Sequence, residues 1–202
     1  MAILEHELRF ASEAVLTGLH RHLLARDEYD AMVNAGAFKD SRIELIEGEI
    51  VEMAPIGDAH AALNDPIAML LRAAFGNGFT VRTQAPIALG DDARPSAPQP
   101  DVTVALGHWQ DYLSRKPVPN DICLVLEIAD TTLSTDRSVK AALYGSAGIT
   151  EYWIVNLNDR QIEAHRTPCE TGYTDVTVFQ AGGHIEALRL PGTRMAVSDF
   201  LP

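Results

Sequence analysis

The sequence has few of the features that mark a secreted, membrane-bound or disulfide-linked protein. It contains only two cysteines, Cys123 and Cys169, and their spacing matches no metal-binding motif. Cys123 lies in an apolar run, so we expect a small buried side chain there. No run approaches the roughly 18 apolar residues of a membrane-spanning helix, and the first ten residues carry acids where a signal peptide carries bases. These absences predict a soluble protein of the reducing cytoplasm with no membrane partner.

Positive charge is scarce as well. Sixteen Lys and Arg residues stand against 28 Asp and Glu residues, which gives a net charge of −12 at pH 7 and works against indiscriminate binding of polyanions. A nucleic-acid partner would therefore need a local basic patch. The candidates for such a patch are Arg72, Arg82, Arg94, Arg115, Lys116 and Arg137.

With 202 residues, 47% of them hydrophobic and 6% aromatic, we expect one domain over 1–202 with an aliphatic core. Residues 1–22 are expected to form a helical or flexible N-terminal arm.

Hydrophobic periodicity divides the rest of the chain into helices and strands. Helical spacing predicts helices over 25–36, over 58–75, and from the N-cap candidates of 130–138 to Gly148, and Pro66 is expected to kink or divide the second. A hairpin is predicted over 42–53, because Gly48 permits the positive φ of a tight turn. Short apolar runs predict strands at 79–89, 100–106, 121–129, 151–157, 161–166, 173–179 and 184–190.

The order of these elements indicates the fold class. Strand, helix and strand over 121–157 form a βαβ unit, which implies a parallel pair of strands joined by a right-handed crossover. The run 151–157 is almost continuously apolar, as expected for a strand that is covered on both faces. The last three runs are expected to be antiparallel strands at an edge of the sheet. The class is therefore α/β or α+β.

Two acids mark the candidate site. Asp101 opens the strand at 100–106, and Glu127 lies between apolar neighbours in the next strand, where a carboxylate is costly unless it is paired or metal-bound. Such a pair suits Mg²⁺, or Mn²⁺, with water and substrate oxygens completing the shell. Asp136, Lys140 and Tyr144 follow at four-residue steps, which is one face of an α-helix. Such a face could deliver an ammonium and a phenol to the two acids.

Each of these residues also has a simpler interpretation. Asp101 is of a type common in turns. Lys140 could form an ordinary surface ion pair with Asp136, and Tyr144 could be a packing residue with a satisfied hydroxyl. In the hairpin, strand alternation places Glu44 on the face opposite Leu45, beside Ile46, where it is either a buried or half-buried acid or an acid that faces solvent.

Several separated blocks, in this order, resemble the Uma family of restriction-endonuclease-like proteins in the PD-(D/E)XK nuclease superfamily. The blocks are RIELIEGEIVEM, His60, Pro100-Asp101, LVLEIAD around Glu127, then Asp136, Lys140, Tyr144 and EYWIV, and the resemblance covers about Glu28 to Val155. It implies a restriction-endonuclease-like fold, with a central mixed β-sheet flanked by helices.

The resemblance also implies roles for individual residues. Asp101 and Glu127 become metal ligands, Glu44 an additional acid, and His60 a residue at the edge of the site. The superfamily pattern places a lysine two residues after the glutamate, where this chain has Ala129. The resemblance implies that Lys140, on the following helix, takes over that role.

These observations lead to an expected function and an alternative. We expect a Mg²⁺- or Mn²⁺-dependent endonuclease that hydrolyses DNA phosphodiester bonds, with Lys140 assisting the attacking water. A homodimer would present two sites to a duplex, with helix 25–36 or the C-terminal strands at its interface. The alternative is a catalytically inactive nuclease-fold module for binding or dimerisation, which is favoured if Lys140 points away from the two acids.

Overall fold

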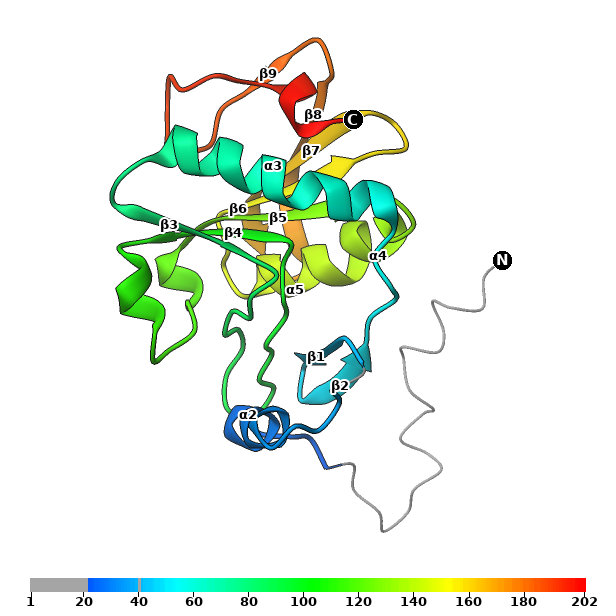
Figure 1. Cartoon of the computed structure of the whole chain (residues 1–202), viewed down its shortest axis with the longest axis vertical. Helices are drawn as coiled ribbons and strands as arrows, with labels where there is room; N and C mark the ends of the chain where they lie inside the picture. The colour runs from blue at the N-terminus through cyan, green and yellow to red at the C-terminus, as the bar shows by residue number, and fades with distance from the viewer. Residues whose placement is uncertain (1–21, 40) are drawn as a thin grey trace.

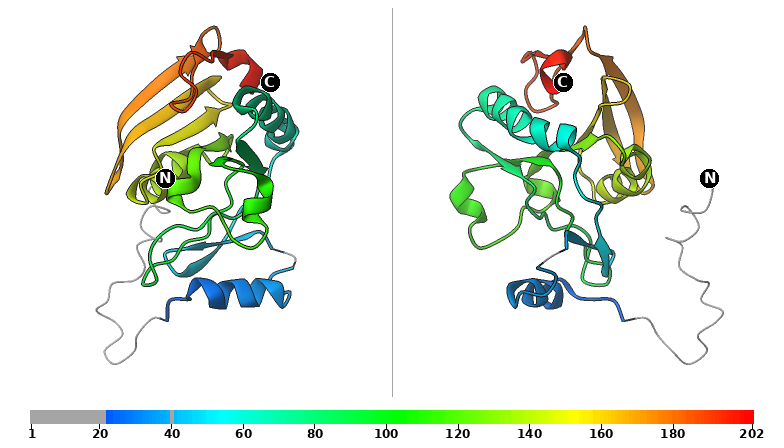
Figure 2. Two further views of the ribbon diagram at one scale, coloured as in Figure 1. Left: turned by 90° about the vertical axis from the view of Figure 1, so that its left-hand side faces the viewer. Right: turned by 45° about the vertical axis from the view of Figure 1, so that its right-hand side comes forward.

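The computed structural model describes residues 22–39 and 41–202 and is built from two parts (Figure 1). The larger part is a six-stranded mixed sheet with helices on both faces. The smaller part, here called the N-terminal lobe, consists of helix α2 and the hairpin β1–β2, and it lies beneath the sheet in both views of Figure 2. The predicted N-terminal arm, 1–22, falls outside the described residues except for its last position.

The main sheet has the strand order β3-β4-β5-β6-β7-β8. Its strands are β3 (Phe79–Thr83), β4 (Val102–Leu106), β5 (Ile122–Ala129), β6 (Glu151–Asn156), β7 (Gln161–Cys169) and β8 (Gly172–Gln180). All neighbouring strands are antiparallel except β5 and β6, which are parallel and joined by a helical crossover. The predicted βαβ unit and the mixed sheet are therefore confirmed.

The central strands β5 and β6 are buried along their whole length, as their apolar sequences predict. Helix α3 (Asp58–Phe75) covers one face, where Ile67 and Leu71 pack in one cluster with Leu124 and Leu126. The crossover helix covers the other face, so that successive side chains of β5 are buried against different helices. Cys123 is 2% exposed, as predicted, and both cysteines are free.

Helix α3 runs without a break through Pro66, so of the two expected effects, a kink or a division, the division is wrong. Proline removes a single N–H donor, the one that would bond to the carbonyl of Ala62. Burial of Ile67, Leu71 and Phe75 against the sheet offsets that loss, because these residues lie on the helical face that contacts the core. In the described part of the chain no helix is long and apolar enough to cross a membrane.

Two predicted strands are shorter than expected. Strand β3 ends at Thr83, because Gln84 adopts a φ of +46°, and the rest of the predicted run, 84–89, makes only an isolated bridge between Leu89 and Ser96. The run 184–190 contributes only β9 (His184–Ile185), which pairs with β10 (Met195–Ala196) outside the main sheet. The remaining short helices are η2 (Trp109–Tyr112), η3 (Pro119–Asp121) and η5 (Val197–Phe200).

The crossover helix is not a regular α-helix. It consists of α4 (Leu133–Thr135), a π-helical turn η4 (Asp136–Lys140) and α5 (Ala141–Ser146). The carbonyl of Asp136 accepts from the N–H of Ala141 and also from the hydroxyl of Tyr152, at 3.2 Å. The Asp136 carbonyl thus accepts two hydrogen bonds, one from within the wider turn and one from strand β6. The expectation of one continuous α-helical face is therefore wrong for 136–140.

The N-terminal lobe has its own small core. Helix α2 (Arg26–Asn34) packs on the predicted hairpin, β1 (Ile43–Ile46) and β2 (Glu49–Glu52), whose turn has two left-handed residues with φ of +50° and +82°. Tyr29, Ile43 and Leu45 form this core together with Ala97, whose N–H donates to the carbonyl of Leu45 at 2.7 Å. Because side chains alternate along a strand, the core residues leave Glu44 on the opposite face of β1.

Candidate active site

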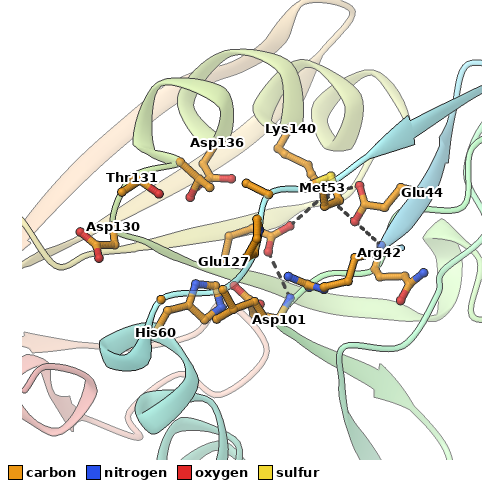
Figure 3. Close-up of a pocket in the computed structure, with 16 residues that line it drawn as sticks. Arg42, Glu44, Met53, His60, Asp101, Glu127, Asp130, Thr131, Asp136 and Lys140 are labelled. Atoms are coloured by element: carbon orange, nitrogen blue, oxygen red, sulfur yellow. Dashed lines mark hydrogen bonds and ion pairs between the residues drawn. The ribbon is translucent and has the colours of Figure 1, made fainter. Parts of the chain in front are cut away.

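A pocket of about 180 Å³ lies between the hairpin, the start of α3 and the π-helical turn (Figure 3). Its walls include all five residues singled out from the sequence: Glu44, His60, Asp101, Glu127 and Lys140. They come from five separate segments of the chain. The fold therefore gathers the predicted site residues into one place.

The register of β4 and β5 places the first two acids side by side. Val102 pairs with Leu126 in an antiparallel ladder, so the next position brings Asp101 opposite Glu127. Residues directly opposite each other point to the same face of a sheet. The N–H of Asp101 donates to Glu127 Oε2 at 3.1 Å, and the N–H of Ile128 donates to Asp101 Oδ2 at 2.8 Å. Both carboxylates are thus fixed by the backbone of the neighbouring strand.

Lys140 turns back from the crossover helix to these acids and is only 4% exposed. Its Nζ donates to both oxygens of Glu44, at 2.9 and 2.7 Å, and lies 3.5 Å from Glu127 Oε1. The simpler interpretation, a surface ion pair with Asp136, is therefore wrong. Burial by itself would lower the pKa of Lys140, but the carboxylates of Glu127 and Glu44 outweigh it and raise the pKa. The group accordingly stays an ammonium.

Tyr144 is fully buried, and its hydroxyl donates to Glu127 Oε1 at 2.7 Å. It is thus a packing residue with a satisfied hydroxyl, and its partner belongs to the site, in line with the expectation that the helix delivers a phenol there. Burial raises the pKa of Glu127 well above its usual value, against the attraction of Lys140, and neighbouring acids raise it further.

His60 and Asp136 flank the central acids. His60 Nε2 lies 2.8 Å from Asp101 Oδ1, so the first turn of α3 contacts a predicted metal ligand. Asp136 is 5% exposed, and burial raises its pKa to about 6, although a hydrogen bond from Thr132 at 2.6 Å opposes the shift. The other lining residues not predicted from the sequence include Arg42, Gln99 and Asp130. Of these, Gln99 could have been found from the sequence, because it directly precedes the Pro-Asp pair. In the structure its N–H donates to Glu44 at 2.8 Å.

The charges of the pocket side chains indicate whether the pocket suits a divalent cation. Four buried carboxylates, those of Glu44, Asp101, Glu127 and Asp136, face one buried ammonium, and such a surplus is costly unless cations or protons offset it. Within residues 22–39 and 41–202, no group of three or more His, Cys, Asp or Glu side chains is arranged to hold a metal ion. Mg²⁺ does not need one, because it usually takes one or two carboxylates and completes its shell with water and phosphate oxygens. The adjacent carboxylates fit that pattern.

The basic residues proposed as a DNA-binding patch do not surround the pocket. None of the six lines it in the described part of the chain. Arg115 is bound by Asp121, Lys116 by Asp30 and Arg137 by Glu163, so carboxylates already offset their charges. Arg94 lies 3.6 Å from Glu47, at the turn of the hairpin. A local patch made of these residues is therefore not formed at the site.

Comparison with known proteins agrees with this architecture. A crystal structure of a putative nuclease from Anabaena variabilis superposes with a TM-score of 0.64 over 88% of this chain and 97% of that chain, which shows a nuclease-like fold at 13% sequence identity. The model of the Uma2 family, whose description is "Putative restriction endonuclease", matches residues 26–198. This chain belongs to the Uma2 family. A comparison with curated proteins finds no significant match.

Proposed function

We propose that this protein is a metal-dependent endonuclease that hydrolyses phosphodiester bonds in DNA. The observation that supports this most directly is the meeting of Asp101 and Glu127 with the ammonium of Lys140 in one pocket. A buried surplus of carboxylates beside a cationic side chain suits the binding of a divalent cation and a phosphate. The family match and the nuclease-like fold give the same reaction class.

In this proposal Asp101 and Glu127 hold Mg²⁺, or Mn²⁺ in its place. When bound, the cation lowers the pKa of a coordinated water and neutralises charge on the phosphate. Lys140 donates hydrogen bonds to the attacking water or to a phosphoryl oxygen, since its raised pKa makes it a poor proton acceptor. Glu44 holds that ammonium in place, and Tyr144 fixes the orientation of the Glu127 carboxylate.

The competing reading is an inactive nuclease-fold module for binding or dimerisation. It predicts the same fold and the same ion pairs, but no metal-dependent turnover. The burial of Lys140 against the acids argues against a module whose site residues have lost their function, because burying several charged groups inside a protein costs stability.

Cleavage assays separate the two readings. Supercoiled plasmid and single-stranded DNA are incubated with the protein and with Mg²⁺ or Mn²⁺, beside Asp101→Asn and Glu127→Gln. An exposed acid outside the pocket, Asp65→Asn, is the matched control. We expect metal-dependent cleavage by the wild type and the control, and loss of cleavage in both site variants. Equal nicking by all four proteins would indicate a contaminating nuclease.

We also propose a homodimer, which would present two pockets to the two strands of a duplex. Strand β8 is one edge of the main sheet, and its Val176 and Val178 are 49% and 47% exposed. An edge strand with exposed apolar side chains can pair with a second copy. Analytical ultracentrifugation tests this, because Val176→Lys should shift the protein to a monomer, whereas a monomeric wild type refutes the proposal.

A further inference from the structure

Among the described residues that line the pocket, Arg42 is the cation whose side chain is exposed. Lys140 is buried and bound to Glu44, and His60 contacts Asp101. Arg42 takes part in none of the ion pairs between described residues. An exposed arginine with no acidic partner in the described part of the chain, at the mouth of an acidic pocket, needs an explanation.

The backbone of Arg42 is well anchored. Arg42 directly precedes β1, and its carbonyl accepts a hydrogen bond from the N–H of Met53 at 2.7 Å, which closes the base of the hairpin. Both residues line the pocket. In Figure 3 the Arg42 side chain extends along the pocket in the direction of Asp101 and Glu127. The backbone therefore holds Arg42 in the wall of the pocket, from which its exposed side chain extends.

The charges of the pocket create a problem for an anionic substrate. Five carboxylates line the walls, those of Glu44, Asp101, Glu127, Asp130 and Asp136. A bound divalent cation would offset part of this charge at the reacting phosphate, but the neighbouring phosphates of a nucleic acid would still meet the acidic rim. A guanidinium suits such a phosphate, because its planar fork can donate two parallel hydrogen bonds.

We propose that Arg42 is a substrate-binding residue that contacts a nucleic-acid phosphate at the mouth of the pocket. The inference rests on the proposed function for its substrate class, since only a polyanion supplies a second phosphate beside the reacting one. Arg42 is thereby assigned to binding and orientation of the strand, while Lys140 acts at the reacting phosphate.

The test measures binding apart from cleavage. Wild type, Arg42→Ala, Arg42→Lys and Arg94→Ala are titrated against a short fluorescein-labelled DNA duplex by fluorescence anisotropy, in EDTA and in Ca²⁺, over a series of NaCl concentrations. Arg94 is the matched control, because it is also exposed but lies beside Glu47, at the turn of the hairpin, whereas Arg42 lies at its base. The KM and kcat of plasmid cleavage are measured in parallel with Mg²⁺.

Loss of one phosphate contact has a defined signature. We expect Arg42→Ala to bind roughly tenfold more weakly at low salt and to lower the slope of log K against log salt by about one. Arg42→Lys should keep the slope but recover only part of the affinity, since lysine keeps the charge without the fork. The KM of Arg42→Ala should rise more than its kcat falls, and Arg94→Ala should match the wild type.

The outcomes separate this inference from the proposed function. Unchanged affinity and salt slope in Arg42→Ala would overturn the role of Arg42, even if the wild type cleaves DNA. If Arg42→Ala binds DNA more weakly than the wild type but the wild type never cleaves DNA, Arg42 is supported as a phosphate-binding residue and the nuclease proposal is overturned. Equal losses in Arg42→Ala and Arg94→Ala would indicate a diffuse charge effect and overturn the specific contact. A wild type that binds no DNA would overturn both proposals.

Discussion

Replacing Lys140 with methionine would remove the ammonium that offsets the buried acids of the pocket. Its Nζ lies 2.7 Å from one oxygen of Glu44 and 3.5 Å from Glu127, and all three side chains are less than a tenth exposed. At an effective dielectric constant near 20, a pair of charges about 4 Å apart interacts by about 4 kcal/mol. Breaking a buried ion pair on one side typically costs about 3–5 kcal/mol. We therefore expect Lys140→Met to lose about 3–5 kcal/mol of the free energy of unfolding at pH 7.

The partner variant and the double variant sharpen this expectation. Glu44→Gln should lower the free energy of unfolding by less, about 2 kcal/mol. Lys140 still has the Glu127 carboxylate as an ion-pair partner, and glutamine can still accept a hydrogen bond from the N–H of Gln99. Lys140→Met combined with Glu44→Gln should be more stable than Lys140→Met alone, since one unpaired buried charge is gone. Because this requires the coupling free energy to exceed the cost of Glu44→Gln alone, we expect a coupling of about 2–3 kcal/mol.

Urea unfolding at pH 7, followed by tryptophan fluorescence, measures these differences, because Trp153 is fully buried beside Phe200. Lowering the pH should return part of the stability of Lys140→Met, since its unpaired carboxylates then take up protons. Wild-type stability in Lys140→Met, or a double variant less stable than both single variants, would refute the argument that Lys140 offsets the acids.

Three further changes test other contacts. Tyr144→Phe removes a buried 2.7 Å hydrogen bond to Glu127 and should cost about 1–3 kcal/mol and lower the kcat of cleavage without weakening DNA binding. Burial raises the pKa of Glu163, but hydrogen bonds from Arg137, Asn156 and Gln161 together outweigh it and lower that pKa to about 2. The stability that these bonds contribute, on the order of 2 kcal/mol, is complete above about pH 4.5 and is lost as the pH falls toward 2. Arg137→Ala, which removes part of it, should therefore be destabilised at pH 7 but little at low pH. Gly145→Ala should cost roughly 3 kcal/mol, since the added Cβ would lie 2.0 Å from a β8 carbonyl oxygen.

Each of these changes has a control and a contradicting result. Tyr29→Phe removes a hydroxyl in the N-terminal lobe and should leave kcat unchanged; an equal fall in both tyrosine variants would argue against a specific role for Tyr144. Arg160→Ala removes an exposed arginine, and a pH profile like that of Arg137→Ala would contradict the assignment to Glu163. Gly182→Ala adds a Cβ in open space, and a loss as large as in Gly145→Ala would contradict the steric argument.

The sequence predicted those parts of the fold that depend on local pattern. The apolar runs of β5 and β6 identify the two central strands, because a strand that is buried on both faces has a continuously apolar sequence. Glu127 was singled out for the same reason, as an acid in a run that should not tolerate one. The match of Asp101 to Glu127 then follows from strand pairing.

The features that the sequence did not predict depend on distant contacts. The π-helical turn involves a hydroxyl from Tyr152 in the next strand, and no periodicity of the helix itself encodes that contact. Helix α3 continues through Pro66 because the sheet buries its other residues, a tertiary effect that outweighs local propensity.

The separate core of the N-terminal lobe has a consequence for how the site is assembled in time. Glu44 and Lys140 are 96 residues apart in the chain, and Glu44 is carried by a hairpin whose own core includes four buried side chains among the described residues. Regions with little buried surface open with a smaller free energy than the whole molecule. Hydrogen exchange should therefore find the amides of β1 opening while β5 remains protected. Each such opening frees Lys140 from Glu44 without unfolding the sheet, so the fraction of molecules with a complete site depends on the local stability of the lobe.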